Sequence, residues 1–430
     1  GPTLLVVPMS LVGNWQREIE RFAPDLKVMI HHGAERLGGD AFVAEVEHHD
    51  VVISTYALTH RDFDHLSRVT WHRLVLDEAQ NIKNPSAKQT TAIRRLRARR
   101  RVALTGTPLE NHLSELWTIM EFLNPGLLGT AAGFRTDFAV PIEKHHHADR
   151  GDQLRRLIRP FMLRRRKSDP GVANDLPEKM EMKVYCNLSR EQATLYQAVL
   201  DEMLGNIESS AGMRRRGLVL AALTRLKQIC NHPVCTETDV PDKTPLAGRS
   251  GKCERLVEML DEILAEGERA LVFTQFRRMG HLLARDLSRR LGREMPFLHG
   301  GTSARGRDQM IARFQSDDPD VPVFLLSLKA GGFGLNLTSA THVFHFDRWW
   351  NPAVEDQASD RAHRIGQSRR VQVHKFVCLG TLEERIDQML EQKRDLADRI
   401  IGGGQTWLTE LSTDQLRDVL ALSQEAVAEA

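Results

Sequence analysis

The sequence Arg73-Leu-Val-Leu-Asp-Glu-Ala-Gln80 predicts a buried strand that ends in two acidic residues. Its apolar run, 74–76, is typical of the end of a strand inside a sheet. Open α/β sheets bind ligands in the crevice beyond the carboxyl ends of their strands. Asp77 and Glu78 therefore suit metal-assisted phosphoryl transfer, in which one carboxylate holds Mg²⁺ and the other activates the attacking water. Most isolated Asp-Glu pairs are solvated loop acids, so this interpretation depends on other motifs in the chain.

The composition of the 430-residue chain is that of an ordinary globular protein. Hydrophobic residues make up 41% and charged residues 27%, and the length predicts two or three domains. No apolar run approaches the roughly 18–20 residues of a membrane span, and no signal peptide opens the chain. Five scattered cysteines indicate a reducing cytoplasm. These features argue against a secreted or membrane protein.

The distribution of charged residues along the chain is more informative than the net charge. The net charge is only +2, but arginines cluster at 94–101, 155–166 and 214–216. Such clusters can follow a nucleic-acid phosphate backbone. An exposed, arginine-rich helix face explains any one cluster equally well, and both alternatives stay open at this point.

Strand-like runs alternate with helical stretches in two parts of the chain, which predicts parallel sheets with helices on both faces. Between about 110 and 250 the pattern is mostly helical and indicates an insertion. We therefore expect an α/β fold with two parallel-sheet lobes. The expected strands are 3–7, 28–30, 51–53, 74–76 and 102–104 in the first lobe, and 270–274, 296–298, 323–326, 343–346 and 371–377 in the second.

The most specific motif is Gln357-Ala-Ser-Asp-Arg-Ala-His-Arg-Ile-Gly-Gln367. Arg361 and Arg364 are three residues apart, so on a helix they project from one face. Two guanidinium groups in this arrangement suit the charge that develops on a transferred γ-phosphate. An exposed basic helix face does not explain the flanking glutamines or the Ile-Gly-Gln ending.

Several motifs in fixed order resemble the Swi/Snf family of superfamily-two, helicase-like ATPases, which translocate on double-stranded DNA. The resemblance runs from residue 3 to about 420. Within the family, the chain is similar to the bacterial, HepA-like branch. It implies two RecA-like lobes. The motifs are 77–80, Leu104-Thr-Gly-Thr-Pro-Leu-Glu-Asn111, Phe161-Met-Leu-Arg-Arg-Arg166, Leu226-Lys-Gln-Ile-Cys-Asn-His-Pro233, Leu328-Lys-Ala-Gly-Gly-Phe-Gly-Leu-Asn-Leu-Thr338, Trp349-Trp-Asn-Pro352 and 357–367.

The resemblance implies roles for individual residues, with ATP and Mg²⁺ as cofactors. Asp77 would bind Mg²⁺, Glu78 would activate the lytic water, and Arg361 and Arg364 would contact the nucleotide phosphates. Coupling of hydrolysis to domain movement is implied for Gln80, Thr105, Gly106, Thr107, Gln357 and Asp360, and nucleotide contacts for Gly332 and Gly334.

The same resemblance implies an interface that binds DNA without distinguishing base sequences. Hydroxyls and amides at strand ends donate hydrogen bonds to phosphates, which are the same in every sequence. The positions that match it are Ser10, Ser54, Thr55, Thr274, Gln275, His299, Gly300, Ser327, Lys329 and Trp350. The implied partner is double-stranded DNA, with a DNA-bound complex such as RNA polymerase as a candidate, and the implied location is the bacterial nucleoid.

One departure from the family is important. The family begins with a phosphate-binding loop of the form G-x-x-x-x-G-K-[ST], which these 430 residues do not contain. Gly251-Lys252 is followed by Cys253, and Gly331-Gly332-Phe333-Gly334 has no lysine. We therefore expect a first lobe truncated before this loop, and expect residues 1–430 alone to hydrolyse ATP poorly.

From these observations we predict a first lobe at 1–111, a helical insertion at 112–249, a second lobe at 250–400 and a tail at 401–430. The predicted function of the full-length protein is ATP-dependent translocation on double-stranded DNA with remodelling of protein–DNA complexes. The alternatives are a DNA-binding or scaffold fragment without ATPase activity, and a strand-separating helicase.

Overall fold

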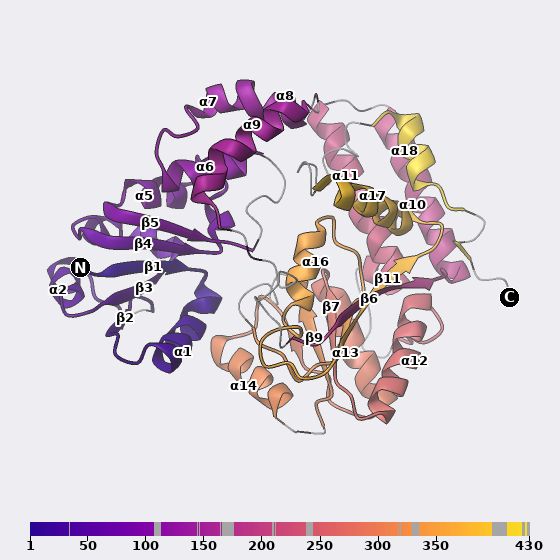
Figure 1. Cartoon of the computed structure of the whole chain (residues 1–430). Coiled ribbons are helices and arrows are strands. Elements are labelled where there is room, and N and C mark those ends of the chain that lie inside the picture. The colour runs from indigo at the N-terminus through magenta and orange to yellow at the C-terminus, as the bar shows by residue number, and fades with distance from the viewer. Residues whose placement is uncertain are drawn as a thin grey trace. The chain divides into compact units, whose positions relative to one another are not determined.

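The chain forms two compact units, which we call the first unit (Gly1–Arg164 and Leu396–Gly402) and the second unit (Arg165–Asp395 and Gly403–Ala430). Figure 1 shows the elements of both in a computed structural model. The structure describes residues 1–430 apart from 34, 107–112, 144, 146, 164, 166–175, 209, 211, 238–243, 317, 319, 329–334, 398–410, 424–425 and 428–430.

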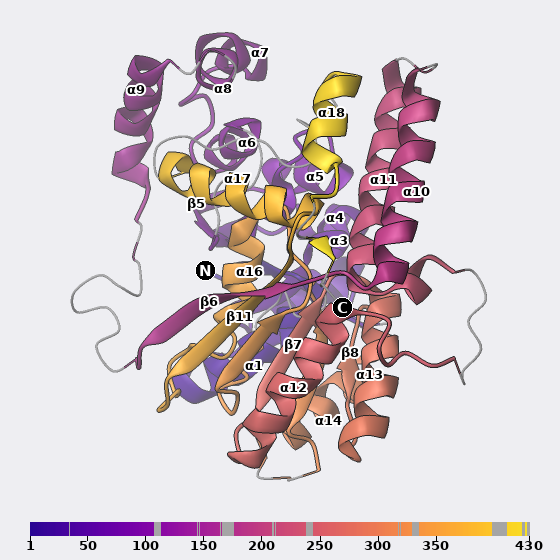
Figure 2. The same ribbon diagram turned by 90° about the vertical axis from the view of Figure 1, so that its right-hand side faces the viewer.

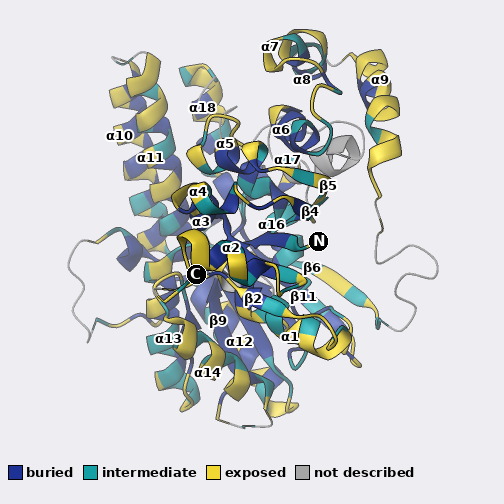
Figure 3. Cartoon of the chain, turned by 90° about the vertical axis from the view of Figure 1, so that its left-hand side faces the viewer, coloured by how far each residue is buried: buried dark blue, intermediate teal, exposed yellow. Residues whose placement is uncertain are grey.

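The first unit contains a five-stranded parallel sheet in the order β2-β3-β1-β4-β5. Its central strands β1 and β4 bury apolar side chains, among them Leu4, Val6, Leu74 and Leu76, in one core. Strand β1 is buried along most of its length, whereas α2 has both buried and exposed residues, as its colours in Figure 3 show. The elements are β1 (Thr3–Val7), α1 (Val12–Phe22), β2 (Val28–Ile30), α2 (Gly39–Val46), β3 (Val51–Thr55), α3 (Tyr56–Arg61), α4 (Phe63–Leu66), β4 (Trp71–Asp77), α5 (Lys88–Arg95) and β5 (Ala98–Leu104).

A group of helices completes the first unit and has its own small core, built around Leu116, Trp117, Phe134 and Leu154. These helices are α6 (Leu113–Leu123), α7 (Ala131–Phe134), α8 (Val140–Glu143) and α9 (Ala148–Ile158).

The second unit contains a six-stranded parallel sheet in the order β6-β11-β10-β7-β9-β8. Both faces of this sheet are covered, because alternate residues of β7 enter two different cores: Val272 lies in one, and Leu271 and Phe273 in the other. Such double burial explains why these strands have continuous apolar runs. The elements are β6 (Lys179–Cys186), α12 (Gly251–Ala265), β7 (Ala270–Thr274), α13 (Arg277–Leu291), β8 (Phe297–Leu298), α14 (Ala304–Gln315), β9 (Val323–Ser327), β10 (His342–His345), α16 (Pro352–Ser359) and β11 (Val371–Cys378).

The segment 112–249, which we expected to be one helical insertion, is divided between the two units. Its part 179–186 is strand β6, which pairs in parallel with β11 of the second sheet (Figure 2). Its helices α10 (Arg190–Glu208) and α11 (Gly212–Asn231) share a core with α17 (Leu382–Ala397) and α18 (Thr413–Leu420). A strand joined to its partner across almost 200 residues leaves no local signal for the long-range pairing. Of the helices that the structure describes, none is long and apolar enough to span a membrane.

Candidate active site

The acid pair lies at the carboxyl end of β4, as the sequence predicts. Asp77 is the last residue of this strand, whose inner residues Leu74 and Leu76 are fully buried. One carboxylate oxygen of Asp77 accepts a hydrogen bond from Trp15 Nε1 at 2.7 Å, and the other accepts one from the backbone N–H of Glu78 at 2.9 Å. The carboxylate is therefore fixed in orientation, and each oxygen keeps a further lone pair.

Glu78 has a left-handed backbone conformation, with φ 52° and ψ 55°. Among the described residues other than glycine, it alone has a positive φ. This conformation costs about 1–2 kcal/mol in a residue with a Cβ. The turn that follows is anchored by the buried side chains of Ala79 and Ile82, and Asn81 Nδ2 donates to the Glu78 carbonyl at 2.8 Å. Residues held in such conformations cluster at functional sites.

A chain of side-chain hydrogen bonds connects Glu78 to the neighbouring strand. Gln80 Nε2 donates to a carboxylate oxygen of Glu78 at 2.7 Å, and the Thr105 hydroxyl donates to Gln80 Oε1 at 2.8 Å. Thr105 directly follows β5, and Gly106 comes next. The structure thus brings together the acid and two of the predicted coupling residues, while Thr107 lies outside the described residues.

Two residues at this site were missed as site residues in the sequence analysis. The Trp15 indole holds Asp77, as described above. The Tyr56 hydroxyl donates to the Asp77 carbonyl at 2.6 Å. Burial, together with the charges of Asp77 and Glu78, raises the pKa of Tyr56, so this phenol stays a hydrogen-bond donor. A possible signal is the position of Tyr56 immediately after the polar end of β3.

The predicted DNA contacts in the first unit are not supported for two residues. Ser54 is fully buried and Thr55 is 5% exposed, because both belong to β3 inside the sheet. Both side chains are thus largely shielded from solvent in this structure, and their contact with DNA stays a prediction. The side chain of Ser10 lies outside the described part of the chain.

In the second unit, the arginine pair lies in a turn and not on a helix as we expected. Helix α16 ends at Ser359, so Arg361 and Arg364 follow it. The Ser359 hydroxyl donates to the Glu355 carbonyl at 3.0 Å and contacts His345 Nε2 at 2.7 Å. A side chain that bonds back in this way competes with continuation of the helix. Arg361 is 6% exposed, and Arg364 is partly exposed.

The arginine turn is held by Gln367, the last residue of the motif. Its Nε2 group lies 2.9 Å from the carbonyls of Thr338 and Ala340 and 3.1 Å from that of Ala362. Gly366 has a φ of 101°, which favours glycine at this position. Gln357 and Asp360 are partly exposed beside the turn, and Lys179 Nζ lies 4.0 Å from Asp360. Gly332 and Gly334 lie outside the described residues.

Three predicted DNA contacts of the second unit make contacts within that unit. Thr274 is fully buried and its hydroxyl donates to Asp347 Oδ2 at 2.6 Å, while the backbone N–H of Gln275 donates to Asp347 Oδ1 at 2.9 Å. Trp350 is partly buried against the α10–α11 core, and Lys227 Nζ lies 5.0 Å from the centre of its ring. These contacts give the three residues a structural role, and their role in DNA binding stays a prediction.

The remaining predicted DNA positions differ in exposure. Ser327 is 7% exposed at the end of β9. His299 is partly exposed, and its Nδ1 accepts a hydrogen bond from Gly301 N–H at 3.0 Å. Gly300 is exposed, and Lys329 lies outside the described residues. Among the described positions of the predicted interface, Gly300 in the loop after β8 is exposed, and His299, Gln275 and Trp350 are partly exposed.

Lys252 belongs to a buried ionic network. Its Nζ donates to Glu383 at 2.7 Å, to the Phe346 carbonyl at 2.9 Å and to Asn231 Oδ1 at 3.1 Å. Asn231 Nδ2 in turn donates to Asp347 at 3.0 Å. Lys252, Glu383, Asn231 and Asp347 are all fully buried. Burial lowers the pKa of Lys252, but Glu383 together with Cys378 and Cys230 outweighs this effect and keeps the pKa above its usual value. Lys252 is therefore not a phosphate-binding lysine. This agrees with its sequence, because Gly251-Lys252-Cys253 does not match the phosphate-binding loop.

Comparison with known families gives two matches along the chain. Residues 1–235 match the SNF2-related domain, and residues 251–366 match the helicase conserved C-terminal domain. The first match alone covers more than half of the 430 residues.

Relatives match almost the whole chain. It is 49% identical over 425 residues to a Bacillus subtilis protein named "Putative ATP-dependent helicase/translocase YwqA", covering 99% of this chain and 46% of the relative. It is 35% identical to the mouse SWI/SNF-related matrix-associated actin-dependent regulator of chromatin subfamily A member 1, covering 94% of this chain and 39% of that protein. The chain thus spans less than half the length of these relatives.

A solved structure shows the same architecture. It is the Sulfolobus solfataricus SWI2/SNF2 ATPase core in complex with double-stranded DNA, with 45% identity and a TM-score of 0.51. The match covers 98% of this chain and 86% of that structure. Together with the two parallel sheets and the ordered motifs, these matches show that the chain belongs to the SNF2 family of helicase-like ATPases.

Proposed function

We propose that the whole protein is an ATP-dependent translocase on double-stranded DNA that remodels protein–DNA complexes. The observation that carries this proposal is the hydrogen-bonded path from Glu78 through Gln80 to Thr105. It places a strained, partly exposed acid at the carboxyl edge of a parallel sheet, and connects it to the neighbouring strand. Relatives named as ATP-dependent helicases support the use of ATP, and a relative bound to double-stranded DNA supports the choice of substrate.

Asp77 fits the role of a Mg²⁺ ligand. Its carboxylate is held by Trp15 and by the Glu78 N–H, and both oxygens keep a lone pair for the cation or for its bound water. Bound Mg²⁺ supplies neutralisation of the phosphate charges. Residues that orient the ligand, such as Trp15, reduce the reorganisation needed when the nucleotide binds.

Glu78 is the group that orients the attacking water and accepts its proton. Gln80 donates to one oxygen of this carboxylate and so fixes its orientation. Because Gln80 is itself held by Thr105, a movement of the segment after β5 would change the position of the Glu78 carboxylate. This contact is the proposed path by which hydrolysis is coupled to movement of the lobes.

Arg361 and Arg364 would stabilise the charge that develops on the γ-phosphate when the two lobes close. Gln367 holds their turn against the segment before β10, so the turn moves together with the second sheet.

We propose that the protein binds DNA through the phosphates of the DNA backbone. The proposed contacts are Lys329 and the loop at His299 and Gly300. A DNA-bound complex such as RNA polymerase and a nucleoid location remain part of this proposal.

The proposal is tested with the whole protein by displacement of a third strand from a triplex. A translocase moving along the duplex removes the third strand only with ATP, and leaves the two duplex strands paired. Separation of the duplex strands would favour a strand-separating helicase. DNA binding without ATP turnover would favour a scaffold.

A further inference from the structure

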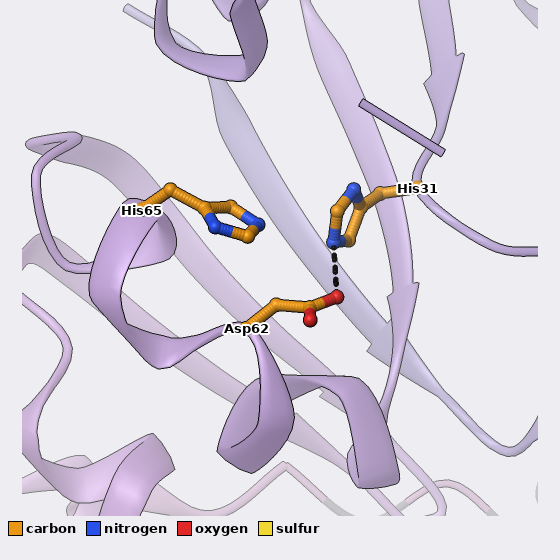
Figure 4. A group of neighbouring side chains, drawn as sticks. All are labelled: His31, Asp62 and His65. Carbon is orange, nitrogen blue, oxygen red and sulfur yellow. Dashed lines mark hydrogen bonds and ion pairs between the residues drawn. The ribbon is translucent and has the colours of Figure 1, made fainter. Parts of the chain in front are cut away.

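His31, Asp62 and His65 form a cluster in the first unit that the proposed ATPase mechanism does not use (Figure 4). His31 follows β2, Asp62 lies between α3 and α4, and His65 is on α4. One ligand atom from each residue lies within 4.8 Å of the other two. His31 Nε2 and Asp62 Oδ2 are 3.0 Å apart, and the His65 ring points toward them in Figure 4.

The cluster contains buried nitrogen atoms without hydrogen-bond partners. His31 is fully buried and Asp62 is 8% exposed. Within the described part of the chain, His31 Nδ1 and His65 Nε2 find no partner. An unsatisfied buried polar atom costs about 1–3 kcal/mol, so such atoms require an explanation. His65 Nε2 faces the other two ligand atoms, which makes a missing ligand the direct explanation for this atom.

The two imidazole rings are also held in position by their neighbours. Burial lowers the pKa of His31 and of His65. Phe42 packs against both rings, with centroid distances of 4.7 Å to His31 and 4.9 Å to His65, and limits their rotation. Imidazoles in fixed orientations need little rearrangement on binding.

We infer that His31, Asp62 and His65 bind a divalent transition-metal ion, with Zn²⁺ as the best match. Two imidazoles and one carboxylate are a ligand set that Zn²⁺ prefers, and three protein ligands leave a fourth position for water. Neighbouring ligands of a tetrahedral Zn²⁺ lie about 3.3 Å apart, given Zn–N bonds of about 2.0–2.1 Å. The ligand atoms lie within 4.8 Å of one another, so each pair has to approach by at most about 1.5 Å. This inference does not depend on the proposed function.

Arg36 competes with the metal for the same carboxylate. Its Nε donates to Asp62 Oδ2 at 2.6 Å and its Nη2 donates to Asp62 Oδ1 at 3.1 Å. The Arg36 side chain is 19% exposed, so it can turn toward water when a cation takes its place. The site therefore alternates between an arginine-paired state and a metal-bound state. Metal binding would connect the segment after β2 to the turn between α3 and α4, and stabilise the first unit.

The test is isothermal titration of the chelator-treated whole protein with Zn²⁺, followed by thermal unfolding with and without Zn²⁺. We expect the wild type to bind one more equivalent of Zn²⁺ than His65→Ala. Because both proteins keep the three consecutive histidines at 145–147, any Zn²⁺ bound there cancels in this comparison. The matched control is His60→Ala, an exposed histidine on α3 that should bind like the wild type. Equal stoichiometry and affinity in the wild type and His65→Ala would overturn the inference.

A second variant tests the competition. Arg36→Gln removes the rival cation and leaves all three ligands, so Zn²⁺ should bind about tenfold more tightly. Unchanged or weaker binding in a folded Arg36→Gln protein would contradict the competition. His65→Gln replaces His65→Ala if the alanine variant unfolds, and circular dichroism establishes whether each variant is folded.

Discussion

The end of β4 and the end of the second sheet's strand β10 have similar sequences and opposite environments. Leu74-Val-Leu76 is followed by Asp77-Glu78, and Val343-Phe-His-Phe346 is followed by Asp347-Arg348. Asp77 and Glu78 are partly exposed and are held by the neutral donors Trp15 and Gln80. Asp347 is fully buried, and the positive groups near it, Lys252 and Lys227, are buried as well.

This difference shows that an acid after a parallel strand is not by itself a catalytic residue. At β4 the charge is oriented by neutral groups and remains available to a metal or to water. At β10 Asp347 is shielded from water in a buried network that also holds the Lys252–Glu383 ion pair, so removal of one partner leaves another unpaired. We therefore expect substitutions at the first site to affect catalysis and those at the second to affect stability.

The largest expected effect concerns the arginine turn. Arg364→Ala in the whole protein should reduce DNA-stimulated ATP turnover by roughly 10³-fold or more, the scale of a lost arginine finger. Arg361→Ala should have the same effect. Because Arg361 is only 6% exposed, its replacement can also affect folding, so the thermal stability of this variant is measured in parallel. Turnover near the wild-type rate in either folded variant would show that the arginine has another role.

The next effect concerns the buried network. Lys252→Met should lower the free energy of unfolding of the second unit by about 3–5 kcal/mol, because Glu383 then remains buried without its partner. Arg255→Met on the same helix is the control, since its ion pair with Glu258 is exposed and should contribute less than about 1 kcal/mol. Denaturant unfolding followed by circular dichroism measures both. Equal losses in the two variants would argue against the network.

Stability should also fall in mild acid. Burial lowers the pKa of His345 to about 4 and that of His374 to about 3, so the folded state binds fewer protons than the unfolded state below pH 6.5. The free energy of unfolding is therefore highest above pH 6.5. It decreases as the pH falls, by up to about 1.4 kcal/mol per pH unit for each histidine. Unfolding measured from pH 6.5 to 4.5 should show this slope, and His374→Gln should reduce it. A flat profile would contradict the prediction.

The smallest expected effect separates the two groups of predicted DNA contacts. Lys329→Ala should weaken binding to all duplex sequences and reduce the log–log salt slope by about 0.9. Thr274→Ala should leave the slope unchanged, because the Thr274 hydroxyl is buried on Asp347. A labelled duplex of about 30 base pairs, titrated at several salt concentrations, distinguishes them. A change of slope in Thr274→Ala would mean that the buried threonine becomes exposed on DNA.

Local patterns in the sequence predicted the two parallel sheets and the position of Asp77 and Glu78, and the family resemblance added Gln80 and Thr105 as site residues. They could do so because strand ends of a parallel sheet share one edge, whatever the distance in sequence. The pairing of β6 with β11 and the contact of Lys227 with Trp350 join segments more than 100 residues apart and leave no local signal. For the same reason Thr274 and Gln275 were interpreted as DNA contacts, because their partner Asp347 comes from a distant strand.

The most direct test of the difference between the two sites is a pair of isosteric substitutions, Glu78→Gln and Glu383→Gln, made in the whole protein. DNA-stimulated ATP turnover per folded molecule and denaturant unfolding are measured for each. We predict that Glu78→Gln reduces turnover by about 10²–10⁴-fold, the range for loss of a general base, with stability unchanged within about 0.5 kcal/mol. Glu383→Gln should destabilise the second unit and retain turnover in the molecules that remain folded. Robust turnover in Glu78→Gln, or a catalytic loss without destabilisation in Glu383→Gln, would contradict the assignment of chemistry to the end of β4.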